Sequence, residues 1–100
     1  MKRLGINIDH IATLRNARGE KHPNPVFAAK EVIKLGADSV TIHLREDRRH
    51  INDLDTKEIC ALNKVLVNLE VSMNNEIIKK ALLYKPNYIC IVPENRKEIT

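Results

Sequence analysis

Aromatic residues are scarce in this chain: it has no tryptophan, one phenylalanine and two tyrosines, which together make up 3% of the sequence. A hydrophobic core must therefore be built from isoleucine, leucine, valine and alanine. The shortage also argues against a nucleic-acid-binding surface, because single-stranded nucleic acids stack on aromatic side chains. The net charge is +4, and much of the basic excess follows apolar runs. This distribution favours small anionic ligands such as phosphates.

Cysteines and long apolar runs are also few. Cys60 and Cys90 lie far apart in apolar surroundings without the spacing of metal ligands, so we expect reduced thiols in the core of a cytoplasmic protein. No apolar run approaches the roughly 20 residues that a membrane-spanning helix needs. Asn7 and Asp9 interrupt the N-terminal segment where a signal peptide has a continuous apolar stretch. These absences favour a cytoplasmic location.

The sequence instead contains a regular alternation of short β-branched runs and amphipathic segments. The alternation predicts strands at 4–8, 39–44, 65–71 and 88–92, and helices at 25–35, after Asn52 and from Asn74 or Asn75. We expect residues 11–25 to form a loop. The order βαβαβαβ predicts a parallel sheet and an α/β fold, either doubly wound or a (β/α)₈ barrel. Because a full barrel takes about 250 residues, residues 1–100 would be the N-terminal portion of a single TIM-barrel domain.

Polar side chains recur on one face of three successive predicted strands. Side chains alternate between the two faces of a strand, so each of these strands has a wholly aliphatic face opposite a polar one. The polar faces carry Asn7 and Asp9, then Thr41, His43 and Arg45, then Asn68 and Glu70. Buried polar groups cost free energy unless they are paired or used. The three strands together therefore predict a site at the carboxyl end of the sheet.

The residue types in this site suggest proton transfer next to anions. Glu70 is a candidate base, although an ion pair with Arg45 is the structural alternative. His43 can shuttle protons near neutral pH, or it can be a hydrogen-bonded core histidine. Arg18, Arg45 and His50 suit phosphate contacts, although each is equally compatible with a surface role.

A metal site is the rival interpretation of the same residues. Asp9, His10, His43 and Glu70 are all possible ligands of a divalent ion. The chain has no H-x-H or H-x-x-x-H pair, and several arginines nearby disfavour a cation. We therefore expect no metal.

Four stretches of the chain resemble the pyridoxine 5′-phosphate synthase family of vitamin B6 biosynthesis. They are NIDHIATLRNARG at 7–19, GAD and then VTIHLREDRRHI within 36–51, NLE at 68–70, and the VPE that begins the last loop. They are long and stand in the family's order and spacing. The resemblance covers the whole chain but only the first part of the family's barrel.

The resemblance implies a (β/α)₈ TIM barrel of which this chain covers about four strands and three helices. It implies a transferase that condenses 1-deoxy-D-xylulose 5-phosphate with 3-amino-2-oxopropyl phosphate, giving pyridoxine 5′-phosphate, phosphate and water. Neither a metal nor an organic cofactor is implied. The partners would be the two phosphorylated substrates and further copies of the chain in a homo-octamer, with no nucleic acid or membrane.

The family's site residues carry over by motif. His43 and Glu70 resemble its proton acceptors, and Asn7 and Arg18 its contacts to the amino-ketone phosphate. The family's contacts to the pentulose phosphate match five further residues by resemblance: Asp9, His10, Arg45, His50 and Thr100. The family's proton-donating histidine and its glycine-rich phosphate cradle have no counterpart within these residues. We therefore expect the chain to be inactive alone.

Two alternatives and one expectation about motion remain. The chain could be a non-catalytic phosphate- or nucleic-acid-binding α/β fragment, or part of a metal-dependent TIM-barrel enzyme. Residues 93–100 have one apolar side chain and four charges after a predicted buried strand. We expect this segment to be an active-site lid that is mobile until the pentulose phosphate binds.

Overall fold

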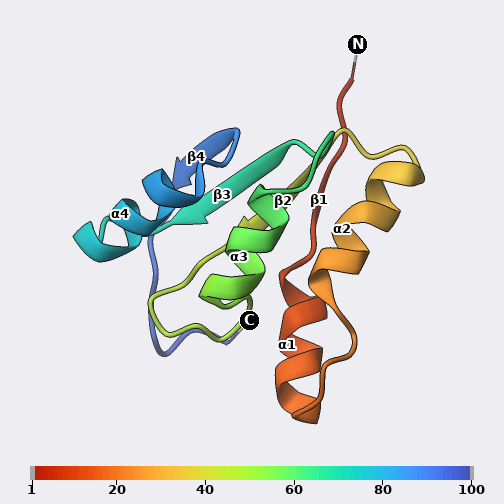
Figure 1. The fold of residues 1–100 in the computed structure, drawn as a ribbon. Coiled ribbons are helices and arrows are strands. Elements are labelled where there is room, and N and C mark those ends of the chain that lie inside the picture. Colours follow the sequence, from red (N-terminus) through yellow and green to blue (C-terminus); the bar gives the residue numbers. More distant parts are fainter. Residues whose placement is uncertain (1, 100) are drawn as a thin grey trace.

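The computed structural model describes residues 2–99, in which strands and helices alternate (Figure 1). The elements are β1 (Gly5–Asn7), α1 (Asp9–Arg18), α2 (Pro25–Lys34), β2 (Ser39–His43), α3 (Asp53–Cys60), β3 (Val67–Val71), α4 (Asn75–Tyr84) and β4 (Tyr88–Ile91). All four predicted strands are present. The three predicted helices are present as α2, α3 and α4.

The four strands form one parallel sheet in the order β1-β2-β3-β4. A doubly wound sheet reverses its strand order at a switch point, whereas a barrel adds each strand beside the previous one. The sequential order is therefore that of the first four strands of a (β/α)₈ barrel, and the predicted fold class is confirmed. The register places Asn7 beside Thr41, and His43 beside Glu70. The polar residues of three strands therefore come to the same level of the sheet.

Helices α2, α3 and α4 lie on one face of this sheet, whereas α1 continues beyond the end of β1 (Figure 1). On β3, Val67, Leu69 and Val71 are fully buried, while Asn68 and Glu70 between them are half-buried on the other face. The described core is aliphatic, as expected: Ile8, Ala12, Ala29, Val40, Ile42, Leu44, Ile51, Ile59, Val65, Val67, Leu69, Val71, Ile77 and Ala81. The aliphatic faces thus hold the helices, and the polar faces lie on the side that a closed barrel encloses.

Asparagine side chains begin three of the helices. Asn24 accepts a hydrogen bond from the Val26 amide at 2.8 Å, with Pro25 at the first helical position. Asn52 forms a capping box with Asp55. Asn74 accepts from two amides of the first turn of α4. These helix starts were predicted from sequence.

The expectation of a loop after β1 is wrong, because α1 occupies residues 9–18. The described chain therefore has four helices rather than three. The only buried residues of α1 are Asp9 and Ala12. A helix that buries so few apolar side chains shows only a weak apolar periodicity in its sequence. Its end is marked by Gly19, which has a left-handed φ of 67° and donates its amide to the carbonyls of Arg15 and Asn16. That glycine was the available sequence signal for a helix end.

The prediction that the last strand is buried is also wrong. All four residues of β4 are exposed, with Tyr88 at 54% and Ile91 at 50%. As the last strand of the order β1-β2-β3-β4, it lies at an edge of the sheet. Cys90 is consequently exposed rather than in the core, whereas burial raises the pKa of the half-buried Cys60 thiol to about 11. Among the described helices, none is both long and apolar enough to cross a bilayer.

Candidate functional site

Asp9, His43 and Glu70 meet at the carboxyl ends of β1, β2 and β3. One carboxylate oxygen or ring nitrogen from each residue lies within 4.8 Å of the others. Asp9 is buried, and the other two side chains are half-buried. The parallel register causes this grouping, because His43 and Glu70 are direct cross-strand neighbours. The structure therefore brings together three residues that the sequence assigned to one site.

Asp9 ties the end of β1 to the end of β2. One of its carboxylate oxygens accepts the His43 backbone amide at 2.8 Å, and the other accepts the Asn7 side-chain amide at 3.1 Å. The Asp9 amide in turn donates to the Asn7 side-chain oxygen at 2.8 Å. Asn7 and Asp9 thus hold each other reciprocally. Both are placed to orient the backbone on which the His43 ring is carried.

The His43 ring contacts a residue that the sequence analysis did not single out. Its Nε2 lies 2.9 Å from a carboxylate oxygen of Glu94, whose side chain is 7% exposed. Glu94 follows β4 just as the other site residues follow their strands. The signal was therefore available in the VPE motif, but Glu94 was treated only as part of a mobile loop.

The alternative role for Glu70, an ion pair with Arg45, is not what the structure shows. Arg45 forms its described ion pairs with Asp47 and Glu98 instead. The Glu70 carboxylate lies with Asp9 and His43. Glu70 and His43 therefore lie together at the strand ends.

Arg45 is the largest fully buried side chain of the described residues, at 1% exposure. Its guanidinium donates to Glu98 Oε1 at 2.7 Å, to the Asn95 carbonyl at 3.0 Å and to Asp47 Oδ1 at 3.2 Å. Burial alone lowers the pKa of Arg45, but the hydrogen bonds to Asp47 and Glu98 outweigh it and the pKa is raised. Arg45 is therefore a fixed positive charge that binds carboxylates in this structure.

The segment expected to be a lid lies against the loop after β2. Arg45 holds Asn95 and Glu98, and Arg49 donates to the carbonyls of Arg96 and Glu98. Figure 1 shows this segment leaving β4 and running back beneath the strand ends. The segment contacts His43 through Glu94, and two arginines anchor it there. Its mobility stays a prediction.

His50 and His10 form a second group beside Asp9. His50 is 4% exposed, and its Nδ1 lies 2.6 Å from the Thr13 hydroxyl oxygen. The rings of His10 and His50 are 5.3 Å apart. Burial lowers the pKa of His50, with His10, Arg45 and His43 adding to the decrease and Asp9 opposing it. The neutral imidazole is therefore favoured, and it can act as both donor and acceptor.

One of the predicted contacts is not assembled with the rest, and another lies outside the described residues. Arg18 sits exposed in the last turn of α1 and pairs with Glu20 at 3.1 Å. Thr100 lies outside the described residues. The roles assigned to both residues stay predictions.

Asp9, His43 and Glu70 also have the donor types of a divalent-ion site. Some of the atoms that would bind the ion already have other partners. Both Asp9 oxygens accept hydrogen bonds, and His43 Nε2 contacts Glu94. An ion would have to replace some of these contacts. The geometry therefore permits a metal but does not require one.

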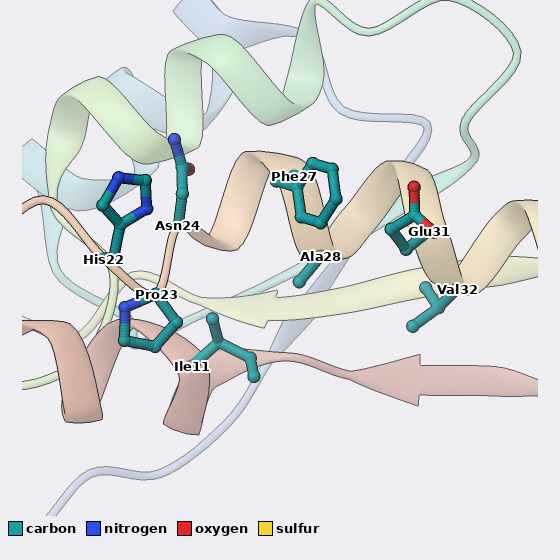
Figure 2. Close-up of a pocket in the computed structure, with 8 residues that line it drawn as sticks. All are labelled: Ile11, His22, Pro23, Asn24, Phe27, Ala28, Glu31 and Val32. Atoms are coloured by element: carbon teal, nitrogen blue, oxygen red, sulfur yellow. The ribbon is translucent and has the colours of Figure 1, made fainter.

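Two hollows lie in different parts of the molecule. One of about 390 Å³ borders Glu46, Ser72 and Glu94 at the ends of β3 and β4. The larger, of about 680 Å³, lies on the helical layer between α1 and α2, where Phe27 and other mostly apolar side chains line it (Figure 2). None of the predicted site residues lines the larger hollow. The predicted site residues therefore lie apart from this apolar hollow.

Comparison with known proteins identifies the family. Residues 4–100 match the family model described as pyridoxal phosphate biosynthesis protein PdxJ. The chain is 66% identical over 100 residues to the pyridoxine 5′-phosphate synthase of Pelagibacter ubique, of which it covers 42%. It is 53% identical over 97 residues to the synthases of Photobacterium profundum and Blochmanniella pennsylvanica, covering 40% of each. The chain thus spans about two fifths of the length of these relatives, and it belongs to the PdxJ family of pyridoxal phosphate biosynthesis proteins.

Proposed function

We propose that residues 1–100 are the N-terminal portion of a single TIM-barrel domain that synthesises pyridoxine 5′-phosphate. The reaction condenses 1-deoxy-D-xylulose 5-phosphate with 3-amino-2-oxopropyl phosphate and releases phosphate and water. The grouping of Asp9, His43 and Glu70, together with the buried Arg45 two residues after His43, carries the proposal. It combines two proton acceptors with an anion site, which is what this condensation needs.

The reaction has several proton transfers. The amine and a ketone condense to an imine, a carbon acid loses its proton, phosphate leaves and the ring closes. Each step requires a base or acid held next to the reacting atom. His43 and Glu70 are direct neighbours on β2 and β3, so both can serve one substrate. In this proposal they are the two proton acceptors.

The phosphate of the pentulose binds at Arg45. In the structure the Glu98 carboxylate occupies one edge of this guanidinium at 2.7 Å. A phosphate oxygen can replace a carboxylate oxygen there, because the arginine fork donates hydrogen bonds to either anion. Asp9, His10, His50 and Thr100 complete the pentulose contacts in this proposal.

Asn7 and Arg18 bind the amino-ketone phosphate in this proposal. Asn7 ends β1 beside Asp9, and Arg18 ends α1. Arg18 has to leave Glu20 and turn toward the site to make this contact. Its exposed, singly paired side chain offers little resistance to that movement.

Activity can be tested in a chimaera that supplies the rest of a barrel. The chimaera joins this chain to the part of the Pelagibacter ubique synthase that follows the 100 matched residues. We expect it to form pyridoxine 5′-phosphate from the two substrates, detected by chromatography and mass spectrometry. A folded chimaera without product, alongside an active intact relative, would contradict the proposal. We expect the 100-residue chain to be inactive when assayed alone.

A metal-dependent barrel enzyme is the second candidate, because Asp9, His43 and Glu70 form a possible ligand set. Exhaustive treatment of the chimaera with a chelator separates the two candidates. Full activity after treatment favours metal-free acid–base catalysis. Loss of activity that one divalent ion restores favours the metal enzyme.

We further propose a cytoplasmic enzyme that assembles as a homo-octamer, as the family resemblance implies. Light scattering coupled to size-exclusion chromatography measures the assembly directly. A chimaera that is active as a monomer would contradict the octamer without affecting the proposed reaction.

A further inference from the structure

Glu94 is a buried carboxylate whose two oxygens face two different groups. Oε2 lies 2.9 Å from His43 Nε2, and Oε1 accepts the backbone amide of Glu46 at 3.1 Å. Its side chain is only 7% exposed. Glu94 therefore connects the end of β4 to the end of β2 at the ring of the proposed base.

The chemistry of these contacts fixes where the His43 ring carries its proton. An ionised carboxylate can only accept hydrogen bonds. A neutral imidazole facing one must therefore present an N–H, which here is Nε2–H. The lone pair of the neutral ring is then on Nδ1.

We propose that Glu94 is a positioning residue that holds His43 in the Nε2–H tautomer and leaves Nδ1 as the proton-accepting nitrogen. This inference rests on the proposed function, in which His43 takes a proton from substrate. The arrangement follows the same logic as a catalytic histidine oriented by a buried carboxylate, which here lies in the segment after β4.

The position of Glu94 links this tautomer to the segment after β4. Arg45 and Arg49 hold residues 95–98 by hydrogen bonds to Asn95, Arg96 and Glu98. Glu94 lies between β4 and these anchored residues. The same contacts that place the segment over the site therefore bring Glu94 to His43.

Glutamine at position 94 is the most informative replacement. Its side chain has one acceptor oxygen, whereas Glu94 needs two acceptors, one for Glu46 and one for His43. In Glu94→Gln either the Glu46 amide loses its acceptor, or the glutamine NH₂ points at Nε2 and favours the Nδ1–H tautomer. The change therefore disturbs the tautomer while preserving the size of the side chain.

Two measurements on the chimaera test the inference. ¹⁵N-histidine spectra report the tautomer of His43, assigned by comparison with His43→Gln, at a pH where the ring is neutral. We expect Nε2–H in the parent and a mixture or Nδ1–H in Glu94→Gln. We expect kcat to fall roughly 10- to 100-fold with little change in KM, since general base catalysis contributes roughly 100- to 10,000-fold and a mixture of tautomers keeps part of it. Glu58→Gln, a change at an exposed residue of α3 away from the site, is the matched control and should change neither quantity.

The outcomes separate this inference from the proposed function. A parent spectrum with Nδ1–H overturns the positioning role even if Glu94→Gln fails to fold. An unchanged tautomer and a kcat within about twofold of the parent in folded Glu94→Gln also overturn it, while the synthase activity stands. If the parent chimaera makes no product, the proposed function fails and the tautomer measurement still decides whether Glu94 orients His43.

Discussion

The two faces of the sheet carry different kinds of side chain. On the helix side, Val40, Ile42 and Leu69 are fully buried among aliphatic neighbours. On the other side, His43 and Glu70 are half-buried and face each other across adjacent strands. Alternating side chains therefore give one strand an aliphatic face and a polar face. Changes at successive residues should consequently have different kinds of effect.

The faces also differ in where their contacts come from. The aliphatic face is covered by α2, α3 and α4, which connect the same strands along the chain. The polar face depends on distant residues, such as Glu94 for His43 and Glu98 for Arg45. Among the described residues, every buried side-chain nitrogen or oxygen has a hydrogen-bond partner. The cost of burying the polar site is thus offset by contacts that no local pattern reveals.

The largest expected effect is on turnover, in Glu70→Gln. Removing a proton acceptor that is used only during reaction should lower kcat roughly 100- to 10,000-fold with substrate affinity nearly unchanged. Steady-state kinetics and substrate binding to the chimaera measure both quantities. His43→Asn should behave alike. Near-normal turnover in Glu70→Gln, or a defect that is mainly unfolding, would assign Glu70 a structural role instead.

The neighbouring residue should show the opposite result. Leu69→Ala removes a fully buried side chain from the helix-facing side, and such truncations cost about 2–5 kcal/mol of unfolding free energy. Urea denaturation of the chimaera measures the loss. Below the unfolding transition, kcat per folded molecule should stay close to the parent value. A kcat loss as large as that of Glu70→Gln would mean that the two faces are not separable.

Much of the fold could be predicted because its signals are local. Asn24 with Pro25, and Asn52 with Asp55, mark helix starts through contacts within a few residues. Helix α1 was missed because DHIATLRNAR buries little apolar surface. Its packing depends instead on a bidentate ion pair from Arg15 to Asp55 of α3, 40 residues away, at 2.6 and 2.7 Å. Single-sequence patterns do not contain such a pairing.

The site was predictable in composition but not in its contacts. Strand alternation correctly grouped Asp9, His43 and Glu70, because register follows from the parallel fold. Among the partners of Arg45, Glu98 was not predictable, since it lies 53 positions further along the chain. Glu94 stands in the VPE motif at a strand end, but its contact with His43, 51 positions away, was not predictable for the same reason. Long-range polar pairs depend on how a loop returns to the sheet, which periodicity does not specify.

The next prediction concerns the anion site on the polar face. Arg45→Ala should raise KM for the pentulose phosphate about 10- to 100-fold, because a charge-assisted hydrogen bond of about 1.5–3 kcal/mol is lost. Its effect on kcat should be smaller than that of Glu70→Gln. Arg45→Lys is the control, since it keeps the charge but loses the fork that contacts Asp47 and Glu98. An unchanged KM in Arg45→Ala would remove Arg45 from the binding site.

A smaller effect is expected in acid, through Asp47. Burial tends to raise its pKa, but hydrogen bonds from Arg45 and Arg49 outweigh this and lower it from 3.8 to about 2. A lowered folded-state pKa stabilises the protein above pH 3.8, and this contribution is lost as the pH falls toward 2. The side chain is 25% exposed, so solvent screening limits the contribution to about 1 kcal/mol. Urea denaturation between pH 5 and pH 2 should show a shallower pH dependence for Asp47→Asn than for the parent, and equal slopes would contradict this.

The smallest effect on stability is expected for Arg18→Ala, which tests the second arginine of the proposed phosphate sites. Arg18 makes one exposed ion pair, with Glu20, and such pairs contribute about 0–1 kcal/mol. Its removal should hardly change the urea midpoint, in contrast to that of Arg45, whose buried guanidinium joins the loop after β2 to residues 95–98.

The kinetic result for Arg18 then decides whether it serves the site. If Arg18 turns inward to bind the amino-ketone phosphate, Arg18→Ala should raise KM for that substrate while leaving KM for the pentulose phosphate unchanged. Glu20→Ala frees Arg18 without removing it and should not raise either KM. An Arg18→Ala chimaera with normal kinetics for both substrates would show that its exposed position in the structure is also its position during catalysis. The amino-ketone phosphate would then have to be held by Asn7 and by residues beyond this chain.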